Sequence, residues 1–214
     1  MSRSSLGAGA VLFIALLFVS PGRAQMGGLI DKAWGVREVD CVGAATPQRK
    51  IISCTAMLKR ARSEDQPAIL SVRADAYEDL GQYENAIQDL DAIIAMHPSD
   101  ANALNSRCWA RAVQGKQLDI ALADCNLSLK LRTDDAPTLD SRGFVNFRMG
   151  NYSAAITDCD SALKINQKLA SSLYVRGLAK LKNGDTAAGN TDIAAANALD
   201  PKIADSYAVY GVKP

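Results

Sequence analysis

Residues Leu104–Val113 read LNSRCWARAV, and three other stretches of the chain share their pattern. These stretches are LSVRADAYED from Leu70, LDSRGFVNFR from Leu139 and LYVRGLAKLK from Leu173. In each of them an arginine stands three residues after the leucine, and a small residue or a cysteine follows the arginine. A pattern that recurs at a fixed interval indicates a repeat architecture, in which every copy is one supersecondary unit.

The interval between copies is close to 34 residues throughout. Glycines at the turn positions are spaced 34, 35 and 34 residues apart, at Gly81, Gly115, Gly150 and Gly184. Small residues flank each turn, which lets two helices approach closely. Apolar residues at three- and four-residue steps predict helices over 68–80, 84–96, 101–114, 118–131, 136–149, 153–165, 170–182 and 186–198. A single unit cannot bury its apolar face alone, so neighbouring units must stack.

This period and these columns resemble the tetratricopeptide repeat, a helix–turn–helix unit of 34 residues. The sequence departs from the family pattern at the first aromatic column, where every unit has leucine, and at two closing prolines, which Thr133 and Gln167 replace. The resemblance implies an all-α solenoid, a right-handed superhelix of antiparallel helix pairs with a concave groove. It covers residues 67–203 as four units, 67–100, 101–135, 136–169 and 170–203.

The two ends of the chain differ from the repeats. Residues 25–66 predict a degenerate capping helix pair, and residues 204–214 predict a capping segment that covers the exposed face of the last repeat. Residues 1–24 are interpreted as a secretory signal peptide, because a short positive start precedes an apolar run and small residues follow it. Cleavage after Ala24 implies a small secreted or periplasmic bacterial protein. The alternative is an uncleaved membrane anchor.

All five cysteines lie after this segment, and an oxidising compartment favours disulfides. Facing residues of an antiparallel helix pair have position numbers with a nearly constant sum, which places Cys108 opposite Cys125. The same rule pairs Cys41 with Cys54 across the capping hairpin. The odd residue, Cys159, faces a glycine and is predicted to be a buried free thiol. A redox or metal site is the alternative for this residue.

An arginine column and an aspartate column run through all four units with the same facing sums. They predict four ion pairs inside the repeats: Arg73–Asp89, Arg107–Asp124, Arg142–Asp158 and Arg176–Asp192. A structural role is favoured over a binding role, because the columns recur in every unit.

The resemblance implies that the outward face of each first helix lines the concave groove. On this sequence that face includes Trp109, Phe144, Phe147, Tyr174, Asn105, Asp140, Arg148 and Lys182. An exposed aromatic patch would mark a protein-interaction site. The alternative is that some of these rings, mainly Phe147 and Tyr174, pack between repeats as core. A clamp for a partner's terminal carboxylate is disfavoured, because Ser71 and Asp75 stand where lysine and asparagine are required.

The chain carries few residues that would support catalysis. His97 is the only histidine, and the sequence has no nucleophile elbow, phosphate-binding loop or metal-ligand spacing. The net charge of +1 comes without a basic stripe, so nucleic acid is not an expected partner. We expect a non-catalytic scaffold of the cell envelope that holds a peptide or protein segment, without cofactor, metal or small-molecule substrate. The alternative is a membrane-anchored component of an envelope assembly complex.

Overall fold

The computed structural model describes residues 38–213 of the 214-residue chain. The predicted signal segment, 1–24, and the first part of the predicted capping pair therefore lie outside the described residues. No helix in the described part is long and apolar enough to cross a membrane. The helices are α2 (Glu38–Gly43), α3 (Pro47–Leu58), α4 (Gln66–Asp79), α5 (Tyr83–Met96), α6 (Ala101–Gln114), α7 (Leu118–Leu131), α8 (Ala136–Arg148), α9 (Tyr152–Ile165), α10 (Ala170–Lys182), α11 (Thr186–Leu199) and α12 (Ile203–Val209).

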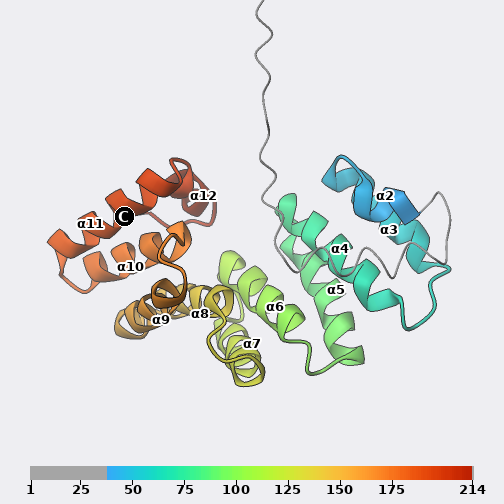
Figure 1. The fold of residues 1–214 in the computed structure, drawn as a ribbon, viewed down its shortest axis with the longest axis horizontal. Coiled ribbons are helices and arrows are strands. Elements are labelled where there is room, and N and C mark those ends of the chain that lie inside the picture. Colours follow the sequence, from blue (N-terminus) through green and yellow to red (C-terminus); the bar gives the residue numbers. More distant parts are fainter. Residues whose placement is uncertain (1–37, 214) are drawn as a thin grey trace, which may run out of the picture. The chain divides into compact units, whose positions relative to one another are not determined.

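The helices form a row of antiparallel hairpins, which confirms the predicted all-α repeat solenoid (Figure 1). The four hairpins are α4–α5, α6–α7, α8–α9 and α10–α11, and each of the eight segments predicted as helical is a helix. Each hairpin packs on the next, α5 on α6, α7 on α8 and α9 on α10. The hairpin α2–α3 packs on α4 at the start of the row.

Small residues set the distance between the two helices of a hairpin. A Cβ atom added at Gly177 would lie 2.8 Å from the carbonyl oxygen of Gly189, closer than real Cβ atoms approach backbone. The column of small residues therefore exists because the backbones of α10 and α11 meet there. Any larger side chain would force the hairpin apart and disturb the packing of its neighbours.

Two disulfides join facing helices. Cys108 on α6 is bonded to Cys125 on α7, with their Cα atoms 5.6 Å apart, and Cys41 is bonded to Cys54 between α2 and α3. Cys159 is free and has no exposed surface. Burial, together with nearby carboxylates, raises the pKa of its thiol. A protonated, enclosed thiol is a poor nucleophile, so Cys159 acts as a small apolar core residue.

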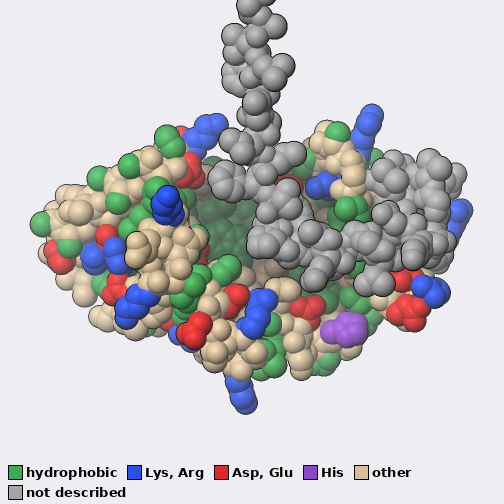
Figure 2. All heavy atoms as spheres, in the orientation of Figure 1, with side chains coloured by type: hydrophobic (Ala, Val, Ile, Leu, Met, Phe, Trp, Pro, Cys, Tyr) green, Lys and Arg blue, Asp and Glu red, His purple; other side chains and the backbone are tan. Residues whose placement is uncertain are grey.

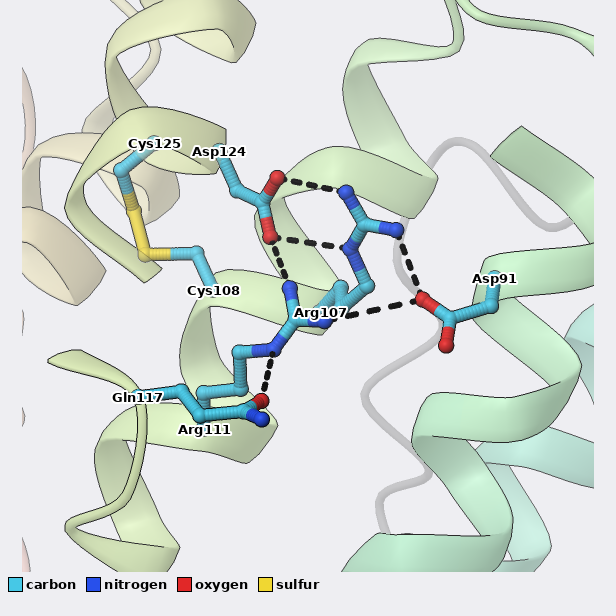
Figure 3. Close-up of polar contacts among 7 residues, drawn as sticks. All are labelled: Asp91, Arg107, Cys108, Arg111, Gln117, Asp124 and Cys125. Atoms are coloured by element: carbon cyan, nitrogen blue, oxygen red, sulfur yellow. Dashed lines mark hydrogen bonds and ion pairs between the residues drawn. A yellow bond between two sulfur atoms is a disulfide. The ribbon is translucent and has the colours of Figure 1, made fainter. Parts of the chain in front are cut away.

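The arginine and aspartate columns tie first helices to second helices (Figure 3). In the second repeat, Nε and Nη2 of Arg107 donate to the two carboxylate oxygens of Asp124, at 2.9 and 2.6 Å. Arg111 adds a bond to the same carboxylate at 2.5 Å. Nη1 of Arg107 reaches Asp91 on α5 of the preceding hairpin, at 2.7 Å. The arginine therefore joins its own two helices and also the neighbouring repeat.

The same contact to the preceding hairpin recurs at the other arginines of the column. In each case the third guanidinium nitrogen, Nη1, donates to a side-chain oxygen on the second helix of the preceding hairpin. In the three later cases this acceptor stands two positions after the column aspartate of that hairpin. These oxygens belong to Thr55, Asp91, Asn126 and Asp160, which accept from Arg73, Arg107, Arg142 and Arg176. The sequence analysis does not anticipate this connection, because it considers only pairs within one unit.

Candidate binding face

Three first helices form one continuous surface on the inner side of the row. α8 packs against both α6 and α10, so the three lie side by side (Figure 1). Figure 2 shows hydrophobic side chains gathered in the hollow on this side. We refer to the surface carrying Trp109 on α6, Phe144 and Arg148 on α8, and Tyr174 on α10 as the inner face.

The structure buries the aromatic residues that the sequence analysis expects to be exposed. Phe144 and Tyr174 have no exposed surface, Phe147 is 9% exposed and Trp109 is partly buried. The expectation of an open aromatic patch is therefore wrong, and the alternative of rings packed as core describes Phe144 as well as Phe147 and Tyr174. Phe147 packs against Tyr152 on α9 of the same hairpin, whereas Trp109, Phe144 and Tyr174 are covered by another segment of the chain.

That segment is the C-terminal helix α12. The ring of Tyr207 packs edge-on against Phe144, with 5.1 Å between centroids, and lies 5.0 Å from the ring of Tyr174. The ring of Tyr210 stands edge-on to Trp109 at 5.9 Å. Offset and edge-on pairs of this kind add stability beyond the burial of apolar area. The inner face thus holds a short helix of the same chain.

The placement goes beyond the predicted role of residues 204–214, which were expected to cover the exposed face of the last repeat. α12 contacts α10 and α11 of that repeat, and in addition Tyr207 reaches α8 and Tyr210 reaches α6. The segment buries Ile203, Tyr207 and Val212, whereas Val209 on its other side is 84% exposed. An amphipathic segment of this pattern lays its apolar side on the inner face.

Arg148 makes a polar contact to this segment. Its Nη1 atom donates a hydrogen bond of 2.6 Å to the carbonyl oxygen of Tyr210, the C-cap residue of α12. The guanidinium lies 5.8 Å from the ring centroid of Phe144 and passes beside Gly115, where an added Cβ would clash with its Nη2 atom. Burial lowers the pKa of Arg148. A cation at the last carbonyl groups of a helix complements the helix dipole.

The other predicted groove residues are not gathered on an open surface. Asp140 is 9% exposed and accepts hydrogen bonds from Ser171 Oγ at 2.7 Å and Ser172 Oγ at 2.5 Å. Burial raises the pKa of Asp140, and the two serine bonds oppose that rise. Asn105 is partly buried and Lys182 is at the end of α10. Asp140 is therefore an internal acceptor between α8 and α10, not a groove residue.

The residues that the sequence analysis missed are Tyr207 and Tyr210. Two of the six tyrosines of the chain stand three positions apart near its C-terminus, and this spacing was the available signal. The hydroxyl groups of Tyr174 and Tyr207 are buried without a hydrogen-bond partner. Burying such a group unpaired costs about 1–3 kcal/mol. The contact between α12 and the inner face is therefore imperfect in its polar details.

The first repeat carries an acidic group on α4. Burial raises the pKa of Glu78 to about 8, and the neighbouring carboxylates of Asp75 and Asp79 add to the rise. The folded chain therefore keeps a proton on Glu78 at pH values where the unfolded chain, with an ordinary pKa of 4.5, has released it. Stability falls as the pH rises between these two values, and the loss is complete above the folded pKa.

Replacement of Glu78 by glutamine is expected to remove this loss. Glu78→Gln should be more stable than the wild type at pH 8.5 by about 2 kcal/mol, since one pKa unit corresponds to about 1.4 kcal/mol and solvent screens part of the effect. Below about pH 4.5 the two proteins should be equally stable. Thermal unfolding across this pH range measures the difference. The exposed ion-pair residue Glu64 supplies the control Glu64→Gln, and a pH-independent gain in Glu78→Gln would contradict the assignment.

The inner face offers ring stacking, apolar burial and one cationic donor. Aromatic residues and arginine are the side chains that dominate protein-binding energies. Within residues 38–213, no group of three or more His, Cys, Asp or Glu side chains could hold a metal ion.

Comparisons with known proteins agree with the architecture. The model of the tetratricopeptide repeat family matches residues 68–100. Comparison with curated protein sequences finds no match. Among solved structures, a crystal structure of MamA is similar with a TM-score of 0.63 and 18% identity, over 81% of this chain and 99% of that one.

Two further solved structures are similar. TTC0263, a thermophilic repeat protein of Thermus thermophilus, has a TM-score of 0.62 and 18% identity, over 77% of this chain and 89% of its own. The first repeat domain of Spaghetti (RPAP3), solved bound to the HSP90 peptide SRMEEVD, has a TM-score of 0.52 and 18% identity, over 56% of this chain and 94% of its own. At these identities the likeness is one of fold.

Proposed function

Because the chain is a tetratricopeptide-repeat protein, we propose that it is a non-catalytic scaffold that binds a segment of another protein on its inner face. Proteins of this fold are generally interaction scaffolds. One observation carries the proposal: the inner face already holds a short helix through ring contacts of Tyr207 and a bond from Arg148 to the Tyr210 carbonyl. A face that holds one helix of this kind has the means to hold another.

The class of segment follows from the side chains. The Spaghetti (RPAP3) domain holds the peptide SRMEEVD, which ends in an acidic residue. In this chain the first repeat has Ser71 and Asp75 where the resemblance implies lysine and asparagine. We therefore propose an apolar, aromatic segment as the ligand, not an acidic terminal tail.

We also propose that the scaffold works in the cell envelope, in the periplasm or outside the cell. The two disulfides support this location, because thiols are kept reduced in the cytosol. The interpretation of residues 1–24 as a cleaved signal supports it as well. N-terminal sequencing of the exported protein should give Gln25 as the first residue. An intact N-terminus on a membrane-bound protein would favour the alternative, a membrane-anchored assembly component.

Affinity capture from an envelope extract tests the scaffold function. Trp109→Ala removes the partly exposed ring at the edge of the inner face, and we expect it to lose at least about 90% of a captured partner, as truncation of an aromatic hot spot costs about 2 kcal/mol or more. Leu127→Ala is the control, since Leu127 is 41% exposed on the second helix α7. Identical sets of captured proteins for the wild type and Trp109→Ala would contradict the proposal.

A further inference from the structure

The contacts of α12 with the inner face specify which ligand this face can bind. α12 itself competes with that ligand for the same place. We propose that the inner face binds the last turn of a partner's short helix carrying aromatic residues at the spacing of Tyr207 and Tyr210. We further propose that residues 203–212 of the chain occupy this place until such a partner displaces them. Both statements rest on the proposed scaffold function and add the ligand's chemistry and its regulation.

The contacts of the resident segment specify what a partner must supply. One aromatic ring has to fill the place of Tyr207, between Phe144 and Tyr174. A second ring has to stand against Trp109, as Tyr210 does. The helix has to end there, because Arg148 donates to the carbonyl oxygen of its C-cap residue. These requirements describe a helix-in-groove mode of recognition with the helix C-terminus as its polar anchor.

One polar atom of the resident segment has no hydrogen-bond partner, and this weakens the segment's hold on the inner face. The hydroxyl of Tyr207 is buried without a hydrogen-bond partner. Asp140 is a nearby carboxylate, but its oxygens accept hydrogen bonds from Ser171 and Ser172 and none from Tyr207. A partner with phenylalanine at this position buries the same ring and leaves no hydroxyl unpaired. It should therefore bind the face at least about fivefold more tightly than the resident sequence does.

The covalent connection to α11 favours α12 over a partner in the competition for the inner face. α12 begins four residues after the last residue of α11, so it is held next to its seat at a high effective concentration. A partner in solution then meets a face that is mostly occupied. Its apparent Kd is raised by the ratio of closed to open molecules. Any change within residues 203–212 that loosens α12 and leaves the inner face intact should tighten the binding of an outside segment.

Binding of a labelled peptide to the full chain tests this competition. The probe is a fluorescent synthetic peptide of residues 202–213 with phenylalanine in place of Tyr207, and anisotropy reports its binding. In the chain itself, Tyr207→Ala loosens the resident segment and should lower the apparent Kd at least about tenfold relative to the wild type. Tyr207→Phe removes the unpaired hydroxyl and should raise it. Equal binding by all three chains, or a shift of both variants in the same direction, would overturn the proposal.

A second variant loosens α12 without changing any ring. Ser206 is exposed, and its N–H donates to the carbonyl oxygen of Lys202 at 3.0 Å. Ser206→Pro removes that bond and breaks the short helix, so it should tighten peptide binding as Tyr207→Ala does, while Ser206→Ala should behave as the wild type. Adding Arg148→Ala to Ser206→Pro should abolish the gain.

The oligomeric state tests whether α12 binds its own chain or a second copy. Light scattering should find that the wild type is a monomer. A dimer that Tyr207→Ala converts to monomers would show that α12 binds the inner face of a second copy, and this result would overturn the proposal.

The peptide-binding experiment and the envelope capture distinguish failure of the proposed competition by α12 from failure of the proposed scaffold function. If Trp109→Ala changes the captured proteins but the peptide does not distinguish Tyr207→Ala from Tyr207→Phe, the scaffold function stands and the resident competitor is wrong. If the peptide results are as expected and capture shows no difference, the inner face is a seat for the chain's own helix and the scaffold function is wrong.

Discussion

Asp124→Ala is expected to lower the free energy of unfolding by about 3–5 kcal/mol, the cost of breaking a buried ion pair on one side. The Asp124 carboxylate accepts hydrogen bonds from both Arg107 and Arg111, and its side chain is 7% exposed. Without it, two guanidinium groups whose side chains are 15% and 8% exposed lose their shared partner. Denaturant unfolding followed by circular dichroism measures the loss.

The matched control for this variant is Asp91→Ala. Asp91 meets the same arginine, Arg107, at 2.7 Å, but its side chain is 49% exposed. Exposed pairs contribute only about 0–1 kcal/mol because water solvates both charges. A loss in Asp91→Ala as large as in Asp124→Ala would contradict the argument that burial decides the value of these contacts.

Removal of the disulfide between α6 and α7 is expected to cost about 3 kcal/mol, given the sequence separation of 17 between the cysteines. The replacement should keep the core filled, and the first repeat shows how, because it has Ala74 and Leu90 at the positions of Cys108 and Cys125. The double variant Cys108→Ala, Cys125→Leu therefore removes the bond with little loss of packing. Denaturant unfolding in oxidising buffer measures the difference from the wild type.

A reducing agent provides the control for the double variant. In reducing buffer the wild type should fall to within about 1 kcal/mol of the variant, since both then lack every disulfide. Mass spectrometry after alkylation should find one labelled cysteine, Cys159, in the unfolded oxidised wild type. Equal stability of the two proteins in oxidising buffer would show that the bond adds nothing to the fold.

The regular period of the repeats explains why contacts between the two helices of a hairpin could be predicted from the sequence. Once the glycine spacing sets the period, the position of every residue within its unit is known, so the facing positions of α6 and α7 follow by counting. The repeat pattern alone therefore places Cys108 opposite Cys125, and Arg107 opposite Asp124. Contacts inside one hairpin depend on local geometry alone, which the repeat pattern specifies.

Contacts that leave the repeat pattern could not be predicted in this way. The bond from Arg148 to Tyr210 joins residues 62 positions apart, and no column of the repeat describes the chain after the last hairpin. The exposure of Phe144 and Tyr174 depends on where that segment folds. A hydrophobic residue on a first helix looks the same in sequence whether a partner or the chain's own end covers it. The aromatic pair in YAVY, Tyr207 and Tyr210, was the only local sign.

The disulfide connectivity has a consequence for how the chain matures. Along the sequence the cysteines pair first with second and third with fourth, and the fifth, Cys159, stays single. A chain that emerges amino terminus first can therefore close each bond as soon as its second cysteine appears. Cys159 then emerges after the other four cysteines have formed their bonds, and its thiol packs against Gly143. Oxidation in order of emergence gives the native pairing, and no later reshuffling step is required.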